Sequence, residues 1–597
     1  MYVQILLSIP VTLWFSFIYV GVGDLVIKKL KLNESFSQEL SFVIRFALGF
    51  GIIGNLITLM GFFNLYSSVA IIILLITLTV VSLSSVYSDL PNLIPFVKSI
   101  PSRLPLSHNK FWTAFALLLL IGYTARGLLP PTGFDTLMYH LSTVKLYLQE
   151  GGFWDIFFNP QSDYPMLSQM HYLTALAIGN DIICKGISTI LFFLHLTLIY
   201  HISIDLSQNR KSAFFSVLIF ATLPTIVANA SSCYVDIHQS LWSLLSVSVL
   251  LKFYENKNYN ILLIAAFCAG MAVQTKIIGI FIVPILISII LYQKRGKTVQ
   301  KSDVWEMSAI IIIPSIMGAV WFFKSHLFNQ TVLSSMPLSA DMQGRSAVFT
   351  MTSFIGRFIT APWTYTIFPS FHRGDTFGPI MLMVLPFIVF LKRDKKVNIY
   401  LLAAAVYLLQ IIFMDTFVLN TSRGTSGRYV IFILAVLVPL VPYTLKNIRY
   451  IYVKNVLNFC VIVSILLGGG IFFKRYNKDW IALLTIKSRN EYYSLQLPEY
   501  DVIQKINSLT TNKKVLLAYN FSEYLIDLPY IVAYKKYNDS EEMVFDLKSN
   551  NVGYIFANNK FDTLENQSSF SEINEYIKPI YNSKGFYLFR FHPSKLK

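Results

Sequence analysis

The run IICKGISTILFFLHLTLIYHISI, Ile182 to Ile204, decides the fold class of this chain. It is apolar along most of its length, and about 20 such residues are enough for a helix to cross the hydrocarbon core of a bilayer. The runs Val69 to Val86 and Val456 to Phe473 have the same character, and about fourteen such segments can be counted, some of them short. The sequence therefore predicts a polytopic α-helical membrane protein.

The composition supports the same conclusion. The 597 residues are 54% hydrophobic and only 14% charged, with a mean hydropathy of +0.56, whereas ordinary soluble domains carry roughly a quarter charged residues. A net charge of +17 raises the question of nucleic acid binding. However, the basic residues lie in short groups between apolar runs and form no single stripe or tail, so membrane topology explains them better.

The basic groups occupy alternate loops, which the positive-inside rule assigns to the cytoplasm. The groups are Lys28, Lys29 and Lys31; Arg210 and Lys211; Lys294, Arg295, Lys297 and Lys301; and Lys392, Arg393, Lys395 and Lys396. The longer polar segments then face outward. We expect an integral, multi-pass protein of a bacterial plasma (inner) membrane, with its C-terminal part outside the cytoplasm.

Four parts are predicted along the chain. Residues 1–126 form an N-terminal transmembrane bundle, and residues 127–181 form a first outer loop with interfacial helices near 137–148 and 166–178. Residues 182–475 form a transmembrane core with a second outer loop at 325–377. Residues 476–597 form a small extracytoplasmic α/β domain, in which we expect helices at 498–508 and 541–547, strands at 514–519 and 552–557, and a closing hairpin near 581–591.

Two carboxylates lie at predicted outer membrane boundaries and are the candidate catalytic residues. Asp135 stands in Gly133-Phe134-Asp135-Thr136-Leu137-Met138-Tyr139-His140, and Asp236 opens the helix that follows Ser231-Ser232-Cys233-Tyr234-Val235. An ionisable group at this depth is costly unless it forms a pair or lines a wet cavity. The alternative interpretation is that each carboxylate only caps a helix.

Two cations on the same side are candidate phosphate ligands. Lys276 lies between two apolar runs, and Arg428 ends an outer loop directly before an apolar helix. A guanidinium there can reach a phosphate at headgroup depth, while the alternatives are a snorkelling lysine and an anchoring arginine. His372 and Arg373, in the second outer loop, are further candidates for substrate binding.

No metal or disulfide site is indicated. Cys184, Cys233, Cys268 and Cys460 lie in or near predicted spans without metal-ligand spacing, and the histidines form no pair at i and i+4. We expect packing roles for most of these residues. No cofactor is predicted with certainty; a divalent metal is compatible with the chemistry but has no ligand pattern to support it.

Taken in order, these elements resemble the GT-C glycosyltransferase superfamily, in the branch that includes the protein O-mannosyltransferases and the lipid A aminoarabinose transferase. The resemblance covers roughly Gly127 to Leu445 and, more weakly, the terminal domain. Its elements are the first outer loop from Asp135 through Tyr139 to Gly151-Gly152, then Tyr164-Pro165-Met166-Leu167, Tyr234-Val235-Asp236, Thr275-Lys276-Ile277-Ile278-Gly279 and Arg428-Tyr429-Val430. Asp135-Thr136 stands where many members have Asp-Glu, and Tyr164-Pro165 where they have a proline pair.

The resemblance implies a transferase that moves a sugar from a polyprenyl-phosphate donor to a glycan, lipid or protein acceptor on the non-cytoplasmic face. Asp135 is then the base, and Lys276 and Arg428 neutralise the leaving phosphate, with inversion at the anomeric carbon. Asp236 orients the acceptor or the base, and Tyr139 and Tyr164 belong to the matching loop elements. No soluble nucleotide donor is expected, because the chain has no glycine-rich nucleotide loop.

Three alternatives differ in class. A transporter or flippase of lipid-linked sugars would carry its charges near the membrane midplane, a non-catalytic scaffold would tolerate loss of Asp135, and an oligosaccharide ligase or polymerase would transfer a whole glycan from a lipid diphosphate. The charges here cluster at the outer boundary, which favours chemistry at that boundary.

Overall fold

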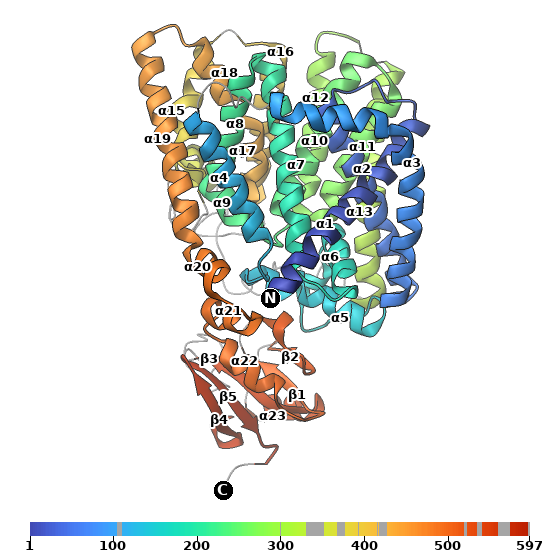
Figure 1. Cartoon of the computed structure of the whole chain (residues 1–597), viewed down its shortest axis with the longest axis vertical. Helices are drawn as coiled ribbons and strands as arrows, with labels where there is room; N and C mark the ends of the chain where they lie inside the picture. The colour runs from blue at the N-terminus through green and yellow to red at the C-terminus, as the bar shows by residue number, and fades with distance from the viewer. Residues whose placement is uncertain are drawn as a thin grey trace.

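The computed structural model describes residues 1–103, 110–298, 300–329, 351–366, 376–391, 393–414, 416, 427–518, 522–533, 540–558 and 573–594. A helical bundle forms one body, and a small α/β domain adjoins one end of it (Figure 1). This arrangement confirms the predicted class of an α-helical membrane protein with a terminal α/β domain.

Among the described residues, eight helices are long and apolar enough to cross a membrane, or nine if the pair Gly427–Leu437 and Leu440–Asn447, bent by 44°, forms one span. Two shorter apolar helices, Tyr259–Thr275 and Ile380–Phe390, add to these. The total of about fourteen spans stays a prediction. The eight spans are α1 (Tyr2–Lys29), α2 (Gln38–Phe62), the Ser68–Ser85 part of α3 (Ser68–Arg103), α7 (Ile182–Ser207), Ile277–Lys294 including α12 (Ile282–Lys294), α13 (Lys301–Asn329), α16 (Lys395–Phe413) and α19 (Ile451–Arg475).

Glycines let the first helices approach closely, as is common between helices in membranes. A Cβ built on Gly49 of α2 would lie 1.8 Å from the carbonyl oxygen of Tyr19 in α1, and one on Gly23 would lie 1.7 Å from that of Arg45. Asp24 sits in the same crossing and pairs with Lys28 at 2.6 Å and Arg45 at 2.9 Å. The N-terminal bundle is therefore built on backbone contact and one buried charge cluster.

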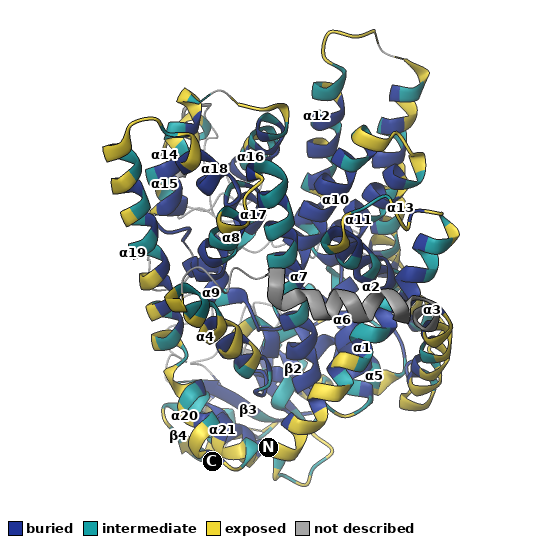
Figure 2. Cartoon of the chain, turned by 45° about the horizontal axis from the view of Figure 1, so that its top comes forward, coloured by how far each residue is buried: buried dark blue, intermediate teal, exposed yellow. Residues whose placement is uncertain are grey.

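The centre of the bundle is α10 (Asp236–Asn256), which is buried along most of its length against α7 and α11 (Tyr259–Thr275). Figure 2 shows the buried residues concentrated on these inner helices and the exposed ones on the outer faces of the bundle. Exposed apolar side chains on α1, α3 and α19 match helices that face lipid. Cys184, Cys233 and Cys268 are buried, and all four cysteines are free, in agreement with packing roles.

The first outer loop contains three helical pieces, a π-helix at Thr136–His140, α5 (Ser142–Glu150) and α6 (Leu167–Ala177). Leu137, Leu141 and Val144 are buried, as their helical spacing predicts. However, α6 differs from expectation. It is enclosed by protein on nearly all sides and packs against α2 and α7, whereas we expected it to lie along the membrane surface.

The terminal domain is a five-stranded sheet with the order β2-β1-β3-β5-β4. β1 (Lys514–Leu517) runs parallel to β2 (Tyr530–Val532) and β3 (Val552–Asn558), whereas β5 (Phe586–Phe591) is antiparallel to β3 and to β4 (Ile577–Ser583). The expected helices appear as α22 (Tyr500–Asn507) and α23 (Ser540–Ser549), and α20 (Asn477–Thr485) and α21 (Arg489–Gln496) connect the domain to α19.

Candidate functional site

Asp135 lies just beyond α4 (Lys110–Gly127), at the start of the π-helix. Its side chain makes no capping hydrogen bond, so the interpretation as a plain helix cap is wrong. One carboxylate oxygen instead accepts hydrogen bonds from the guanidinium of Arg428 and from the hydroxyl of Tyr139, the latter at 3.4 Å. The base candidate, one predicted cation and one predicted tyrosine therefore meet.

Asp236 forms a second ion pair with Lys276. The lysine nitrogen lies 2.5 Å from the carboxylate, and the two side chains are 16% and 3% exposed. Asp236 is the first residue of α10, and the N-cap position before it is occupied by Val235. Lys276 stands where the chain turns back after α11, a turn that requires glycine three residues later, since a Cβ on Gly279 would lie 2.0 Å from the carbonyl oxygen of Ala272.

Aromatic rings join the two pairs into one site. The Lys276 ammonium lies 4.3 Å from the ring centre of Tyr429, and the Arg428 guanidinium lies 5.4 Å from the same ring and 5.7 Å from that of Tyr234. Such stacking holds cations in place without consuming all their hydrogen bonds. The two cations, each paired with a carboxylate from another segment of the chain, thus share the Tyr429 ring, which we call the aromatic wall of the site.

His140 and Tyr164 border this site. Burial lowers the pKa of His140 to about 3, against the opposing effect of Asp236, and its Nδ1 lies 2.9 Å from the side-chain nitrogen of Gln169. His140 is therefore neutral at physiological pH. Burial raises the pKa of Tyr164 to about 12, with Tyr429 as the next cause, so Tyr164 acts as a hydroxyl and not as a phenolate.

A polar cavity of about 480 Å³ opens beside the Asp135–Arg428 pair. Three arginines line it, and one of them, Arg126, donates to the carbonyl oxygen of Ala230, stacks 3.8 Å from the Tyr476 ring centre and lies 3.6 Å from Asp479. Such a lining suits an anionic ligand. The full lining is Arg126, Thr132, Gly133, Phe134, Ala228, Asn229, Ser232, Tyr234, Arg428, Arg475 and Tyr476.

Sequence reasoning missed Arg126 and Arg475. Each ends a long apolar helix, α4 and α19 respectively, and an arginine in that position usually anchors a span at the interface. The sequence does not show that the ends of α4 and α19 lie next to each other. The structure does, and it places both arginines in the lining of one cavity. The predicted residues His372 and Arg373 lie outside the described part of the chain.

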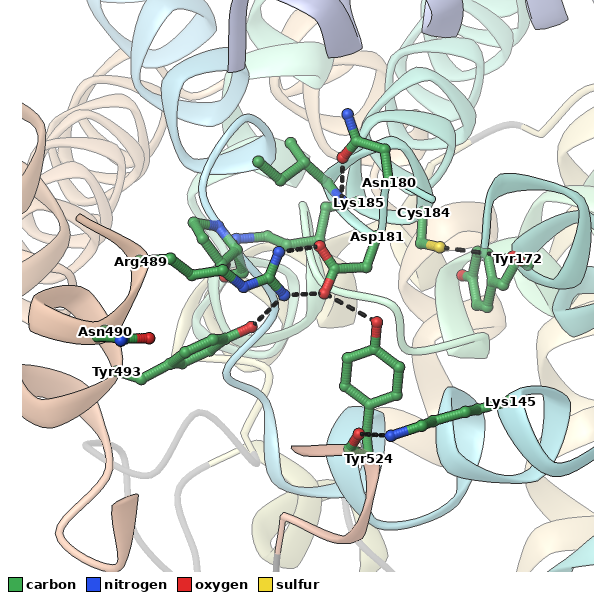
Figure 3. Close-up of polar contacts among 12 residues, drawn as sticks. Lys145, Tyr172, Asn180, Asp181, Cys184, Lys185, Arg489, Asn490, Tyr493 and Tyr524 are labelled. Carbon is green, nitrogen blue, oxygen red and sulfur yellow. Dashed lines mark hydrogen bonds and ion pairs between the residues drawn. The ribbon is translucent and has the colours of Figure 1, made fainter. Parts of the chain in front are cut away.

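A buried carboxylate ties the terminal domain to the first outer loop (Figure 3). Asp181, which is 2% exposed, accepts from Arg489 at 2.9 Å and from the Tyr524 hydroxyl at 3.0 Å. On the same side, the Lys145 ammonium of α5 donates to the carbonyl oxygens of Tyr524 and Ile526 at 3.0 and 2.9 Å. These contacts hold the domain against the loop that carries Asp135.

Metal-binding groups are not assembled in the part of the chain that the structure describes. No cluster of three or more histidine, cysteine, aspartate or glutamate side chains there could hold an ion. The charge that the site offers to a substrate comes from arginine and lysine side chains.

The fold is that of a polytopic membrane protein, and the charged candidate site lies at one end of its helical bundle. Comparisons with known proteins narrow the class further. The sequence model described as dolichyl-phosphate-mannose-protein mannosyltransferase matches residues 170–321. No curated protein sequence matches the chain.

Solved structures give a broader match. ArnT from Cupriavidus metallidurans bound to undecaprenyl phosphate aligns with a TM-score of 0.50 at 10% identity, over 81% of this chain and 98% of that one. The apo form of the same protein aligns with a TM-score of 0.49 at 12% identity, over 80% and 97%. The oligosaccharyltransferase AglB from Archaeoglobus fulgidus, in complex with an inhibitory peptide and a dolichol phosphate, aligns with a TM-score of 0.44 at 12% identity, over 82% and 75%. The chain shares the GT-C fold and resembles the branch of ArnT and the protein mannosyltransferases.

Proposed function

We propose that this chain is a membrane glycosyltransferase that transfers a sugar from a polyprenyl-phosphate donor to a glycan, lipid or protein acceptor. The protein whose structure gives the TM-score of 0.50 is bound to undecaprenyl phosphate, and the matching family model is described by a dolichyl-phosphate sugar. Both names point to a donor held by a lipid phosphate.

The observation that carries this proposal is the direct contact between Asp135 and Arg428 at the edge of a cavity lined by arginines. A transfer from a lipid phosphate needs a base near the acceptor and cations near the leaving group. The carboxylate and the guanidinium are hydrogen-bonded to each other. Lys276 is near them, because its ammonium and the Arg428 guanidinium both lie over the Tyr429 ring.

In the proposed step, the hydroxyl oxygen or amine nitrogen of the acceptor attacks the anomeric carbon of the sugar, and Asp135 takes up the proton that this oxygen or nitrogen loses. The bond between that carbon and the phosphate oxygen breaks, and the electron pair leaves with the polyprenyl phosphate. Arg428 and Lys276 stabilise the phosphate charge, and Asp236 fixes the Lys276 ammonium. A single displacement inverts the anomeric configuration.

The substrate-contacting residues that we assign to this step are Tyr139, Tyr164, His372 and Arg373, together with Arg126 and Arg475 of the cavity. Tyr139 donates to the base itself, which keeps the carboxylate directed at the acceptor. Guanidinium groups bind phosphate oxygens in pairs of parallel hydrogen bonds, so the arginines give the cavity a preference for the phosphate end of the donor.

We further propose that the site and the terminal domain face away from the cytoplasm, in a bacterial plasma membrane. The positive-inside rule supports this orientation, since the basic loops lie at the other end of the bundle. Labelling with a membrane-impermeant maleimide tests it. A Lys584→Cys variant of the exposed β4–β5 turn should react in intact cells, and an Arg210→Cys variant should react only after lysis.

The function is tested with purified protein in lipid, radiolabelled polyprenyl-phosphate sugars and a membrane extract as the source of acceptor. We expect the wild-type protein to move label from lipid to acceptor and Asp135→Asn to lose about 10²-fold or more of that rate. The matched control is Asp205→Asn, which removes a carboxylate paired at 2.7 Å with Lys396 at the other end of the bundle.

Each result has a clear meaning. A rate for Asp135→Asn equal to that of the wild type, with the control also active, rejects Asp135 as the base. Label that remains on the lipid but crosses the bilayer in vesicles indicates a flippase. Transfer of a whole glycan, seen as the mass of the product, indicates a ligase or polymerase.

A further inference from the structure

A second charged cavity, of about 350 Å³, lies at the other end of the bundle. Four lysines line it, and they come from the end of α10, the end of α12, the loop that follows α12 and the start of α16 (Figure 1). Its lining is Tyr254, Lys257, Gln293, Lys294, Lys297, Thr298, Gln300, Asp303 and Lys395. The segment Ile277–Lys294 joins the Lys276 turn to this cavity through 18 residues, about 27 Å of helix. The two cavities are therefore separate sites.

Only one of the four lysines is neutralised by neighbouring carboxylates. Lys294 pairs with Asp303 and with Glu306, the latter at 3.3 Å, and the Tyr254 hydroxyl donates to Glu306 at 2.6 Å. Both carboxylates are buried and already engaged. Among the described residues, no carboxylate lies within ion-pair distance of the other three lysines. The cavity thus presents an excess of positive charge.

The lysines also repel one another. The pKa of Lys257 is lowered, first by partial burial and then, against the effect of Glu306, by the charges of Lys294, Lys297 and Lys395. Lys257 stacks 4.2 Å from the Tyr254 ring centre, which holds it toward the cavity. Because like charges gathered from four segments are unfavourable alone, an anion between them would relieve the repulsion.

Two exposed apolar residues flank the cavity-lining residues along the sequence, and we refer to them as the apolar frame. Leu291, one turn before Lys294, is 53% exposed, and Trp305, directly after Val304 and Asp303, is 57% exposed. Tryptophan is enriched at the level of lipid headgroups, and an exposed leucine on a transmembrane helix faces lipid. The ligand that fits both the lysines and this apolar frame carries a negative charge on an acyl-chain body.

We propose that this lysine cavity binds the headgroup of an anionic phospholipid at the membrane face opposite the terminal domain. The phosphate would lie among Lys257, Lys297 and Lys395, with the acyl chains along Leu291 and Trp305. Basic pockets between transmembrane helices at the cytoplasmic side are known to hold such headgroups. The proposal does not depend on the transferase function, so the two can fail separately.

The test is the binding of phosphatidylglycerol to the full chain in detergent, measured by native mass spectrometry against phosphatidylcholine with the same acyl chains. We expect a clear preference for phosphatidylglycerol in the wild type, and a loss of about tenfold or more in its affinity for the triple variant Lys257→Gln, Lys297→Gln, Lys395→Gln. The matched control, Lys29→Gln, Arg210→Gln, Lys211→Gln, removes the same charge from exposed positions and should retain the affinity within about twofold.

Three outcomes would overturn the proposal. The first is equal binding of both lipids by the wild type, and the second is equal loss in the control variant. The third is displacement of the lipid by inorganic phosphate at matched concentration, which would assign the cavity to a soluble phosphate. Should the triple variant fail to fold, the wild type still decides, because brominated phosphatidylglycerol must quench Trp305 more than brominated phosphatidylcholine does, with Trp305→Phe identifying the signal.

Discussion

Arg428 donates directly to the carboxylate of Asp135, although the two residues are 293 positions apart in the sequence. The candidate base and a candidate phosphate-binding residue thus form an ion pair with each other in the absence of substrate. A donor phosphate in the cavity competes with Asp135 for the guanidinium, and transfer of Arg428 to the phosphate would release the carboxylate toward the acceptor. In the proposed mechanism, donor binding and exposure of the base would therefore be linked through the Arg428 side chain.

The first prediction concerns Arg428. Arg428→Gln should lower kcat/KM by about 10²- to 10³-fold, since a hydrogen-bond donor directed at the developing phosphate charge is lost. The kcat/KM of Arg428→Lys should lie between that of Arg428→Gln and that of the wild type, because lysine keeps the charge but not the paired hydrogen bonds. Arg393→Gln, an exposed arginine at the other end of the bundle, serves as the control. Unchanged transfer kinetics in Arg428→Gln would remove this residue from the site.

The second prediction separates structure from chemistry in the Asp236–Lys276 pair. Removing one partner of a buried pair costs about 3–5 kcal/mol, so Asp236→Asn or Lys276→Met alone should lower the thermal midpoint strongly. The double variant should recover part of that loss, because no charge is left buried without a partner. Catalytic activity, in contrast, should stay low in all three variants. Recovery of activity in the double variant would give the pair a purely structural role.

The third prediction addresses how the terminal domain is held. Among the described residues, Arg489→Gln leaves the buried Asp181 carboxylate with Tyr524 as its hydrogen-bond partner, and breaking such a pair is expected to cost about 3–5 kcal/mol. The domain should then be cut faster by protease at α20 and α21, and sugar transfer should fall although every residue near Asp135 is intact. The Arg590→Gln variant, on an exposed face of β5, is the comparison. Equal cleavage rates in both variants would contradict the anchoring role.

The fourth prediction is a pH dependence of stability. Burial raises the pKa of Glu523, whose Oε2 atom has no hydrogen-bond partner among the residues that the structure describes. The folded state therefore keeps a proton on Glu523 that the unfolded chain releases above its ordinary pKa of about 4.3. The contribution of Glu523 to stability therefore falls as the pH rises beyond that value, by at most about 1.4 kcal/mol per pH unit. The buried neutral His140 contributes with the opposite sign below a pH of about 6.5, because its pKa is lowered by burial.

Glu523→Gln should remove this slope and raise the thermal midpoint at pH 8 relative to the wild type. Melting curves between pH 5 and pH 8 measure the effect. The exposed Glu34 provides the control, since Glu34→Gln should leave the curve unchanged. A difference in thermal midpoint between Glu523→Gln and the wild type that does not grow with pH over this range would contradict the proposed cause.

Sequence patterns predicted the apolar helices and most of the terminal domain because each depends on local periodicity. The helical spacing of Leu137, Leu141 and Val144 predicts a buried face. The strand β3 lies within one residue of its expected range. The strand Tyr530–Val532 was not predicted, because three residues are too few to show an alternation of apolar and polar side chains. The π-helix at Thr136–His140 differs from an α-helix by one hydrogen-bond step, which side-chain spacing does not reveal.

The candidate site could be predicted as residues but not as contacts. Asp135, Asp236, Lys276 and Arg428 were each identified by a charge at an apolar boundary. Which carboxylate pairs with which cation depends on where four distant segments end in space, and no single segment encodes that. Arg126 and Arg475 illustrate the limit, because helix-end arginines that anchor a span and those that line a cavity look alike along the chain.

The contacts that Arg489 and Tyr524 make with Asp181 have a consequence for the synthesis and membrane insertion of the protein. Arg489 and Tyr524, which hold the Asp135 loop, follow the last long apolar helix, α19, in the sequence. They are therefore synthesised after the helices of the bundle. A chain arrested before residue 489 would sit in the membrane with its helices in place and its reactive loop unsupported. Sugar transfer would thus have to wait until synthesis has passed residue 524, because Arg489 and Tyr524 are the residues that hold Asp181.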